Sequence, residues 1–187
     1  MRNQPKSILQ LLLSRNHSAL LSTLANFSAF YERTHLPVFR YLYGLTGGPQ
    51  EDVEDLTAEA FLRAWRARHG FQGDAEAALG WLMKIARRLV IDDYRRRKAR
   101  PVMEDPIPAE LPLNAPWPEE MALASEQQQM LWSFLCALPD ESREILVLRY
   151  LLGWRVNQIA EYLEIPENNL SATIHRTLEH LRQQWPA

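Results

Sequence analysis

Residues 154–184 read WRVNQIAEYLEIPENNLSATIHRTLEHLRQQ, and the spacing of apolar residues in this segment indicates two helices joined by a tight turn. Apolar residues recur at intervals of three and four, which predicts a short helix over about 155–163 and a longer one from Pro166, a residue suited to a first helical turn. Only Glu164 and Ile165 separate the two helices. The pattern favours a helix-turn-helix, with a plain helical hairpin as the alternative. The inward positions are Ile159, Ala160 and Leu163 in the first helix and Leu170, Ile174, Leu178 and Leu181 in the second.

Upstream of this stretch, helical spacing continues over residues 130–138 and 145–152, with turns expected at Pro139 and Gly153. Before that, the chain changes character. Six of its twelve prolines lie between Pro101 and Pro118, and residues 101–130 contain six acids and no base. Because proline removes backbone donors and disfavours helix before it, we expect residues 101–124 to be an extended, acidic linker.

The segment before the linker is helical as well. Apolar residues at spacings of three and four predict helices around residues 36–43 and 56–65, and the sequence GLTGGP at 44–49 separates them. The expected fold class is therefore all-α, with two small helical domains joined by a flexible linker, the C-terminal one a helix-turn-helix. The predicted boundaries are an N-terminal extension 1–22, a first domain 23–100, the linker 101–124 and a second domain 125–187.

Positive charge is concentrated at the end of the first domain. Residues 81–100, WLMKIARRLVIDDYRRRKAR, hold eight of the 21 basic residues and two acids, a net charge of +6 in a chain of net charge −2. A solvated helix end is one interpretation, because cations stabilise a helix C-terminus. The concentration of charge in an otherwise acidic protein favours the other interpretation, which is phosphate binding.

Several function classes are disfavoured by composition. Cys136 is the single cysteine, so the chain has no intrachain disulfide and no paired-cysteine metal motif. The five histidines are scattered, and no glycine-rich phosphate loop is present. No apolar stretch approaches the roughly 18 residues that span a bilayer. We expect a cytoplasmic protein that is not an enzyme, uses no cofactor or metal, and does not insert into membranes.

Three motifs together resemble a known family. They are GGPQEDVEDLTAEAFLRAWRA, then WLMKIARRLVIDDYRRR, and after the linker LPDESREILVLRYLLGWRVNQIAEYL. In this order they are similar to the extracytoplasmic-function group of bacterial sigma factors, over roughly residues 24–100 and 125–184. The resemblance implies that the first domain (region 2) binds core RNA polymerase and melts the −10 promoter element, while the second (region 4) reads the −35 element. It also implies a possible anti-sigma partner.

The resemblance assigns candidate residues to three surfaces. A glycine-bounded loop at 69–80 would capture an extruded −10 base. The candidates for core-polymerase binding are Asp52, Asp55, Leu56, Glu59, Phe61, Leu62 and Trp65. Those for the −10 element are Trp81, Lys84, Arg87, Arg88, Asp92, Arg95 and Arg96. Those for the −35 element are Glu167, Asn168, Asn169, Ser171, Thr173, His175 and Arg176.

The second domain departs from the family pattern. Arg155 and Gln158 stand where the family has a capping hydroxyl and a glutamate, and the last helix has few bases. Loss of an N-cap hydroxyl costs about 1 kcal/mol. Two alternatives to a sigma factor therefore stay open: a stand-alone helix-turn-helix regulator, and a sigma-like interaction protein with weakened DNA binding. Residues 1–22 lie outside the resemblance.

Overall fold

The computed structural model describes residues 27–73, 75–99 and 126–184 of the chain. Within these ranges every regular element is helical, as the sequence predicts, and none of the helices is long and apolar enough to cross a membrane. The expected N-terminal extension and the whole of the expected linker lie outside the described residues. The predicted domain boundaries therefore stay predictions.

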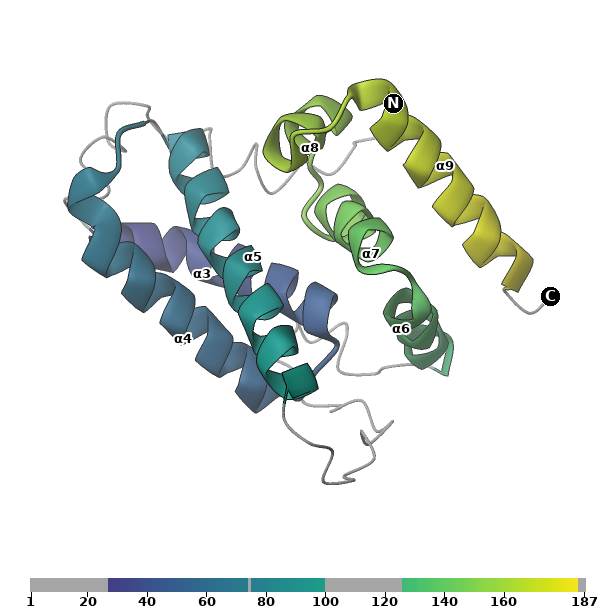
Figure 1. Ribbon diagram of the computed structural model, residues 1–187, viewed down its shortest axis with the longest axis horizontal. Coiled ribbons are helices and arrows are strands. Elements are labelled where there is room, and N and C mark those ends of the chain that lie inside the picture. The colour runs from purple at the N-terminus through teal and green to yellow at the C-terminus, as the bar shows by residue number, and fades with distance from the viewer. Residues whose placement is uncertain (1–26, 74, 100–125, 185–187) are drawn as a thin grey trace, which may run out of the picture.

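Three helices form an N-terminal group, on the left in Figure 1. Their apolar faces meet in a core that includes Val38 and Leu42, Ala60 and Phe61, and Leu82 and Leu89. The predicted GLTGGP break is confirmed: Gly47 has a φ of +56° and donates its N–H to the Tyr43 carbonyl at 2.8 Å, closing the first helix. The helices are α3 (Phe27–Thr46), α4 (Gln50–Ala67), which continues into the short turn η1 (Arg68–Gly70), and α5 (Ala75–Ala99).

A C-terminal group follows, on the right in Figure 1. It contains α6 (Glu126–Ala137), α7 (Asp140–Leu146), the wider π-helical turn η3 (Val147–Leu151), α8 (Val156–Leu163) and α9 (Glu167–Gln184). The predicted turn between α8 and α9 is confirmed. Glu164 has a left-handed backbone, with a φ of 60°, and the Ile165 N–H closes the end of α8 on the Ala160 carbonyl at 3.0 Å.

The packing of α8 against α9 departs from the sequence prediction at one position. Ile159, Ala160, Leu170 and Ile174 are buried as expected, but Leu178 is 38% exposed. α8 has eight residues and α9 has 18, so α8 covers only the first part of α9, and α7 also packs against α9. The buried residue on the next turn is instead Thr177, whose hydroxyl donates to the Thr173 carbonyl at 2.8 Å.

The two groups are in contact, and their buried residues form one continuous hydrophobic core. The end of α3 crosses behind α5 to reach the C-terminal group (Figure 1). There the Tyr43 and Trp132 rings meet edge to face at 5.1 Å, and an Arg143 guanidinium nitrogen donates to the Leu45 carbonyl at 2.8 Å. A methyl group at Gly44 would lie 2.7 Å from a methyl carbon of Val147. The junction is thus packed closely enough to require a glycine at position 44.

Candidate nucleic-acid interface

The outer face of α5 carries most of the residues predicted to face the −10 element. Leu82, Met83, Ala86 and Leu89 point into the core, which turns positions 81, 84, 88, 92 and 95 to the opposite side, because residues three or four apart share a helix face. Along this face Trp81 is half-buried, whereas the other four residues are exposed: Lys84, Arg88, Asp92 and Arg95. Arg96 is exposed and lies next to this face, with a guanidinium nitrogen 3.7 Å from a carboxylate oxygen of Asp93.

At the start of α5, two aromatic rings lie together. The Trp81 and Phe71 ring centroids are 5.0 Å apart, with the planes tilted by 35°. Phe71 belongs to the predicted base-capture loop, and a β-carbon on the neighbouring Gly73 would lie 2.8 Å from its ring. The basic outer face of α5 thus begins beside an aromatic pair, and nucleobases stack on aromatic rings of this kind.

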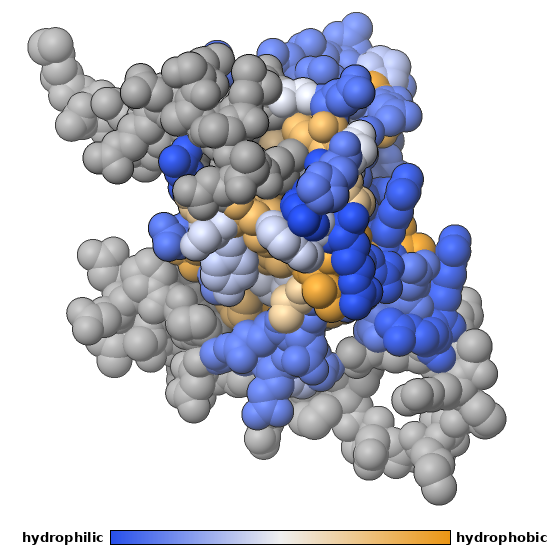
Figure 2. All heavy atoms as spheres, turned by 90° about the vertical axis from the view of Figure 1, so that its left-hand side faces the viewer, coloured by the Kyte–Doolittle hydropathy of each residue, from blue (hydrophilic) through white to orange (hydrophobic). Residues whose placement is uncertain are grey.

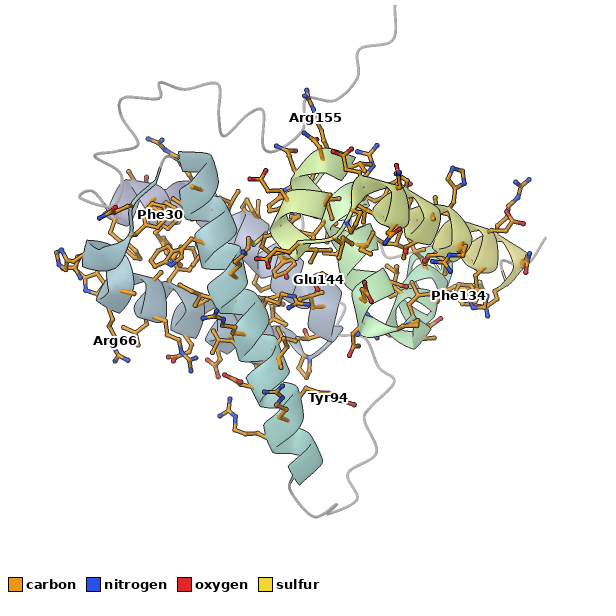
Figure 3. The ribbon with its side chains drawn as sticks, turned by 45° about the horizontal axis from the view of Figure 1, so that its top comes forward. Phe30, Arg66, Tyr94, Phe134, Glu144 and Arg155 are labelled. Atoms are coloured by element: carbon orange, nitrogen blue, oxygen red, sulfur yellow. The ribbon has the colours of Figure 1, made fainter. Side chains whose placement is uncertain are left out.

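Arg87 lies off this outer face and points toward the C-terminal group. Its Nε donates to both carboxylate oxygens of Glu144 on α7, each at 2.9 Å. The Tyr41 hydroxyl donates to one of the same oxygens at 2.5 Å and lies 3.1 Å from the Tyr162 hydroxyl. The Glu144 side chain is only 5% exposed, and Figure 3 shows it between α5 and the C-terminal helices. We call Tyr41, Arg87, Glu144 and Tyr162 the Glu144 cluster.

The protonation states in the Glu144 cluster follow from burial and charge. Burial raises the pKa of Tyr41 well above its usual value, and the adjacent Tyr162 and Glu144 raise it further. Burial also raises the pKa of Tyr162. Partial burial disfavours the charge on Arg87, but the hydrogen bond to Glu144 and the charge of Glu144 outweigh it, so the pKa of Arg87 is raised. At neutral pH both tyrosines are protonated and Arg87 is charged.

A second, exposed ion pair joins the two groups nearby. Lys84 Nζ lies 3.0 Å from a carboxylate oxygen of Glu164, the left-handed residue between α8 and α9. The hydrogen bond from Lys84 and its charge lower the pKa of Glu164. Two of the bases predicted to face DNA, Lys84 and Arg87, therefore have acidic partners from the C-terminal group. These partners were not predicted from the sequence, and the one available signal was an acid, Glu144, directly beside the apolar residues Ile145 and Leu146.

The residues predicted to bind core polymerase share one face of α4, with one exception. Phe61 is 4% exposed and packs edge to face with Phe30 and Tyr31, so it belongs to the core. The ring points inward because its position falls on the same side of α4 as Ala60 and Ala64. The other six residues are exposed or half-buried: Asp52, Asp55, Leu56, Glu59, Leu62 and Trp65.

Apolar side chains of α3 and α4 reach the surface. Figure 2, which views the molecule from the left of Figure 1, shows hydrophobic atoms exposed among hydrophilic ones. Leu62 and Trp65 are each 42% exposed, and Tyr31 and Leu36 of α3 are similarly exposed. The Arg68 guanidinium carbon lies 3.4 Å from the centre of a Trp65 ring. Exposed apolar groups beside charged ones are typical of a protein-binding surface.

The −35 candidates lie on α9, and all but Thr173 are exposed. Thr173 is half-buried, and a guanidinium nitrogen of Arg176 lies 3.4 Å from its hydroxyl. Within the described residues, no hydrogen bond involves the side chain of Asn168 or Asn169, which leaves both amides available to a ligand. At the start of α8 the Arg155 N–H donates to Gln158 Oε1 at 2.9 Å. Gln158 thus caps one backbone donor, even though the capping hydroxyl is absent.

Comparison with known proteins matches both groups. The sigma-70 region 2 model covers residues 30–100, and the sigma-70 region 4 model covers residues 128–181. The chain belongs to the extracytoplasmic-function group of sigma factors. As a sigma factor, it binds core RNA polymerase and directs promoter-specific initiation of transcription. A stand-alone helix-turn-helix regulator is not favoured, because such a protein would not account for the region 2 match.

Relatives of this sigma factor extend over most of its length. It is 28% identical over 170 residues to the ECF RNA polymerase sigma factor SigL of Mycobacterium tuberculosis. These residues cover 91% of this chain and 94% of SigL. It is 27% identical over 155 residues to SigW of Bacillus subtilis, covering 79% of this chain and 82% of SigW. It is 35% identical over 151 residues to SigE of Mycolicibacterium smegmatis, covering 78% of this chain and 56% of SigE.

Two solved structures share the fold of this sigma factor. One is the sigma factor RpoE in complex with the anti-sigma factor NepR from Bartonella quintana, with a TM-score of 0.65 and 17% identity over 84% of this chain and 95% of that one. The other is CnrH in complex with the cytosolic domain of CnrY, with a TM-score of 0.60 and 20% identity over 96% of this chain and 97% of that one.

Proposed function

We propose that this sigma factor uses three helices for three separate contacts. The α4 face that includes Asp55, Leu62 and Trp65 binds core polymerase, the outer face of α5 binds the −10 element, and the first half of α9 reads the −35 element. The observation that carries the proposal is the outer face of α5, where Lys84, Arg88 and Arg95 share one side of the helix beside the Trp81–Phe71 pair.

This arrangement suits strand separation at the −10 element. Extruding a base costs a few kcal/mol of lost stacking and pairing. Stacking on an aromatic side chain is worth about 1–3 kcal/mol per base, and the lysine and arginines add phosphate contacts. An aromatic pair at one end of a row of bases supplies both contributions to the same strand. The protein needs no cofactor for this work, and we propose that it is not an enzyme in its own right.

Few basic residues on α9 are available to bind the −35 element. His175 and Arg176 are the only bases among the seven candidates on α9, so phosphate attraction is weak and specificity comes from contacts to base edges. An asparagine can pair bidentately with adenine, and a glutamate can accept from cytosine N4. Asn168, Asn169 and Glu167 are exposed at the start of α9, which is where a recognition helix contacts bases.

The wider setting follows from the same proposal. We propose that the protein acts in the cytoplasm, where core polymerase and promoter DNA are found. The fold that it shares with RpoE, which was solved with the anti-sigma factor NepR, supports an anti-sigma partner for this chain as well.

The test is run-off transcription with core RNA polymerase and the purified full chain on a library of genomic fragments, followed by sequencing of transcript ends. We expect a small set of start sites that appear only when the chain is added and that share two upstream elements. Core polymerase that binds the chain yet starts at no chain-dependent site would contradict promoter recognition and favour the sigma-like interaction protein. The start sites also define the promoter for the experiments below.

A further inference from the structure

Region 2 exposes apolar side chains at the point where residues 1–26 join the described chain. Tyr31 is 41% exposed, and Leu62 and Trp65 are each 42% exposed. Phe27, the first residue of α3, has its ring 5.0 Å from the Trp65 ring. We call Phe27, Tyr31, Leu62 and Trp65 the Trp65 patch. We propose that residues 1–26 dock over this patch and along the outer face of α4, so that core polymerase must displace them. This inference rests on the proposed role of α4.

The composition of residues 1–26 calls for a partner surface. Eight of these residues are leucine or isoleucine, in two runs over 8–13 and 20–24. Leaving so many apolar side chains in water is unfavourable, by about 25 cal/mol for each Å² of apolar area. The same residues include no acid and three bases, which are Arg2, Lys6 and Arg15. A surface that suits this segment is therefore apolar in one part and acidic in another.

The outer face of α4 has this combination of properties. The Trp65 patch lies at its second half, where the apolar side chains are exposed. Its first half, residues 50–60, carries five acids and no base, and such a surface attracts a basic segment. The five acids are Glu51, Asp52, Glu54, Asp55 and Glu59.

The direction and length of the segment fit the outer face of α4. The first residue of α3 lies beside the second half of α4 (Figure 1), where the Phe27 ring contacts Phe61 and Trp65. A segment that leaves Phe27 along α4 therefore meets the Trp65 patch first and the acids later. Its own order is the same, since the apolar run 20–24 is nearer to Phe27 than Arg15 is. Even at the helical rise of 1.5 Å per residue, 26 residues reach about 39 Å, which exceeds the roughly 27 Å of α4.

The docked segment and core polymerase compete for the same side chains. Asp55, Leu62 and Trp65 belong to the face proposed to bind polymerase, and one surface cannot hold both occupants. If only a fraction of the molecules has α4 uncovered, the apparent dissociation constant for core polymerase is the intrinsic constant divided by that fraction. Weakening the docked segment should therefore strengthen polymerase binding.

The first experiment measures access of a thiol reagent to α4 in the full chain. Leu62→Cys and Arg63→Cys are each combined with Cys136→Ser, which removes the single natural cysteine, and the rate of reaction with a maleimide is followed. The two positions are matched, because Leu62 is 42% exposed and the Arg63 side chain 44%. They differ in direction: Phe61 faces α3, and Arg63, two residues later, points about 200° away from it. We expect Leu62→Cys to react several-fold more slowly than Arg63→Cys.

The second experiment weakens the docked segment itself. Leu20→Asp with Leu24→Asp places two charges in the apolar run nearest to Phe27. Ser22→Asp with Thr23→Asp adds the same charge at neighbouring positions and removes no apolar side chain. We expect the leucine variant to raise the rate at Leu62→Cys to that at Arg63→Cys, and to bind core polymerase several-fold more tightly than wild type. The control variant should change both quantities less.

The outcomes separate this inference from the proposed function. Equal reaction rates for Leu62→Cys and Arg63→Cys would overturn docking on α4. Protection of Leu62→Cys that increases with protein concentration would also overturn it, because a second copy would then be covering α4. Unchanged polymerase affinity in the leucine variant would overturn the competition. If Leu62→Cys is protected but Asp55→Lys binds polymerase as wild type does, the segment docks as inferred and the proposed role of α4 is removed instead.

Discussion

Glu144 is a charged residue in a buried position, and hydrogen bonds compensate its loss of water. Two come from Arg87 and one from Tyr41. Because the single Tyr41 proton goes to Glu144, the Tyr41 oxygen is left to accept from Tyr162, 3.1 Å away. The cluster therefore depends on two neutral tyrosines as much as on the ion pair, and this dependence gives it a pH limit.

We predict that alkaline pH destabilises the folded protein through Tyr41. Since folding raises the pKa of Tyr41, its contribution is fully present below the unfolded value near 10 and is lost as the pH rises above it. Tyr41→Phe should lower the free energy of unfolding at pH 8 by about 1.5–3 kcal/mol, because it removes a hydrogen bond to a charged group. Between pH 8 and 11, the free energy of unfolding measured with urea should then fall less steeply for the variant than for wild type. Parallel curves for the two proteins would refute the assignment.

We also predict that one of the two asparagines at the start of α9 discriminates a −35 base pair. Asn168→Ala and Asn169→Ala are made separately, and binding to a panel of −35 variants is measured. We expect one of them to lose discrimination at a single base pair, by roughly 1–3 kcal/mol, with little change in thermal stability. A loss of stability with discrimination intact would show instead that the asparagine caps free backbone amides of the helix.

At the scale of elements, each helix has one face in the core and another face available to a partner. On α4, Phe61 faces the core while Leu62, one residue later, is exposed, since successive residues on a helix point about 100° apart. The same division on α5 places Leu89 inside and Arg88 outside. This allows matched variants in which neighbouring residues of like charge differ only in the face they occupy.

For α4, we predict that Asp55→Lys weakens binding to core polymerase, whereas Glu54→Lys does not. Both acids are exposed, but only Asp55 lies on the face with Leu62 and Glu59. A pull-down with core polymerase measures the affinity, and circular dichroism checks that both variants remain helical. Equal affinities for the two variants would remove α4 from the polymerase interface.

For α5, we predict that changing Lys84, Arg88 and Arg95 together to alanine lowers the salt dependence of promoter binding. Each lost phosphate contact should reduce the slope of log affinity against log salt by about 0.9. Asp92→Ala on the same face is the control, because it removes an acid and should tighten binding without lowering the slope. An unchanged slope in the triple variant would mean that the bases are only a solvated helix surface.

At the scale of the whole molecule, local pattern predicted elements better than it predicted partners. The breaks at Gly47 and Pro139 carry their own chemistry in the sequence, the break at Glu164 follows from the apolar spacing on either side of it, and all three stand where expected. The apolar spacing of Phe61 with Ala60 and Ala64 is compatible with a core position as well as with polymerase binding, and the structure buries it. The exposure of Leu178 was not foreseen, because periodicity gives a helix face but not which part of that face its neighbours cover. The pairing of Arg87 with Glu144, 57 residues away, depends on how the two regions meet, which no local pattern contains.

Two helical glycines provide a test of the packing between regions 2 and 4. In a helix interior, alanine is more stable than glycine by roughly 0.5–1 kcal/mol. Gly80 in α5 has open space where a side chain would be, whereas a methyl at Gly44 in α3 would contact Val147 at 2.7 Å. We expect Gly80→Ala to raise the urea midpoint of the full chain and Gly44→Ala to leave it unchanged or lower it. A clear increase in the urea midpoint of both variants would argue against close packing of the two regions.

Position 44 thus shows how packing between regions 2 and 4 limits the drift of the sequence over generations. For α3 alone, most other residues would improve the helix, so random mutation would soon replace a glycine with no other duty. The contact with Val147 opposes that replacement only while the two regions are together. A lineage whose protein no longer closed would be released from the constraint, and loss of glycine at this site would then be an early, heritable sign that the closed form had been abandoned.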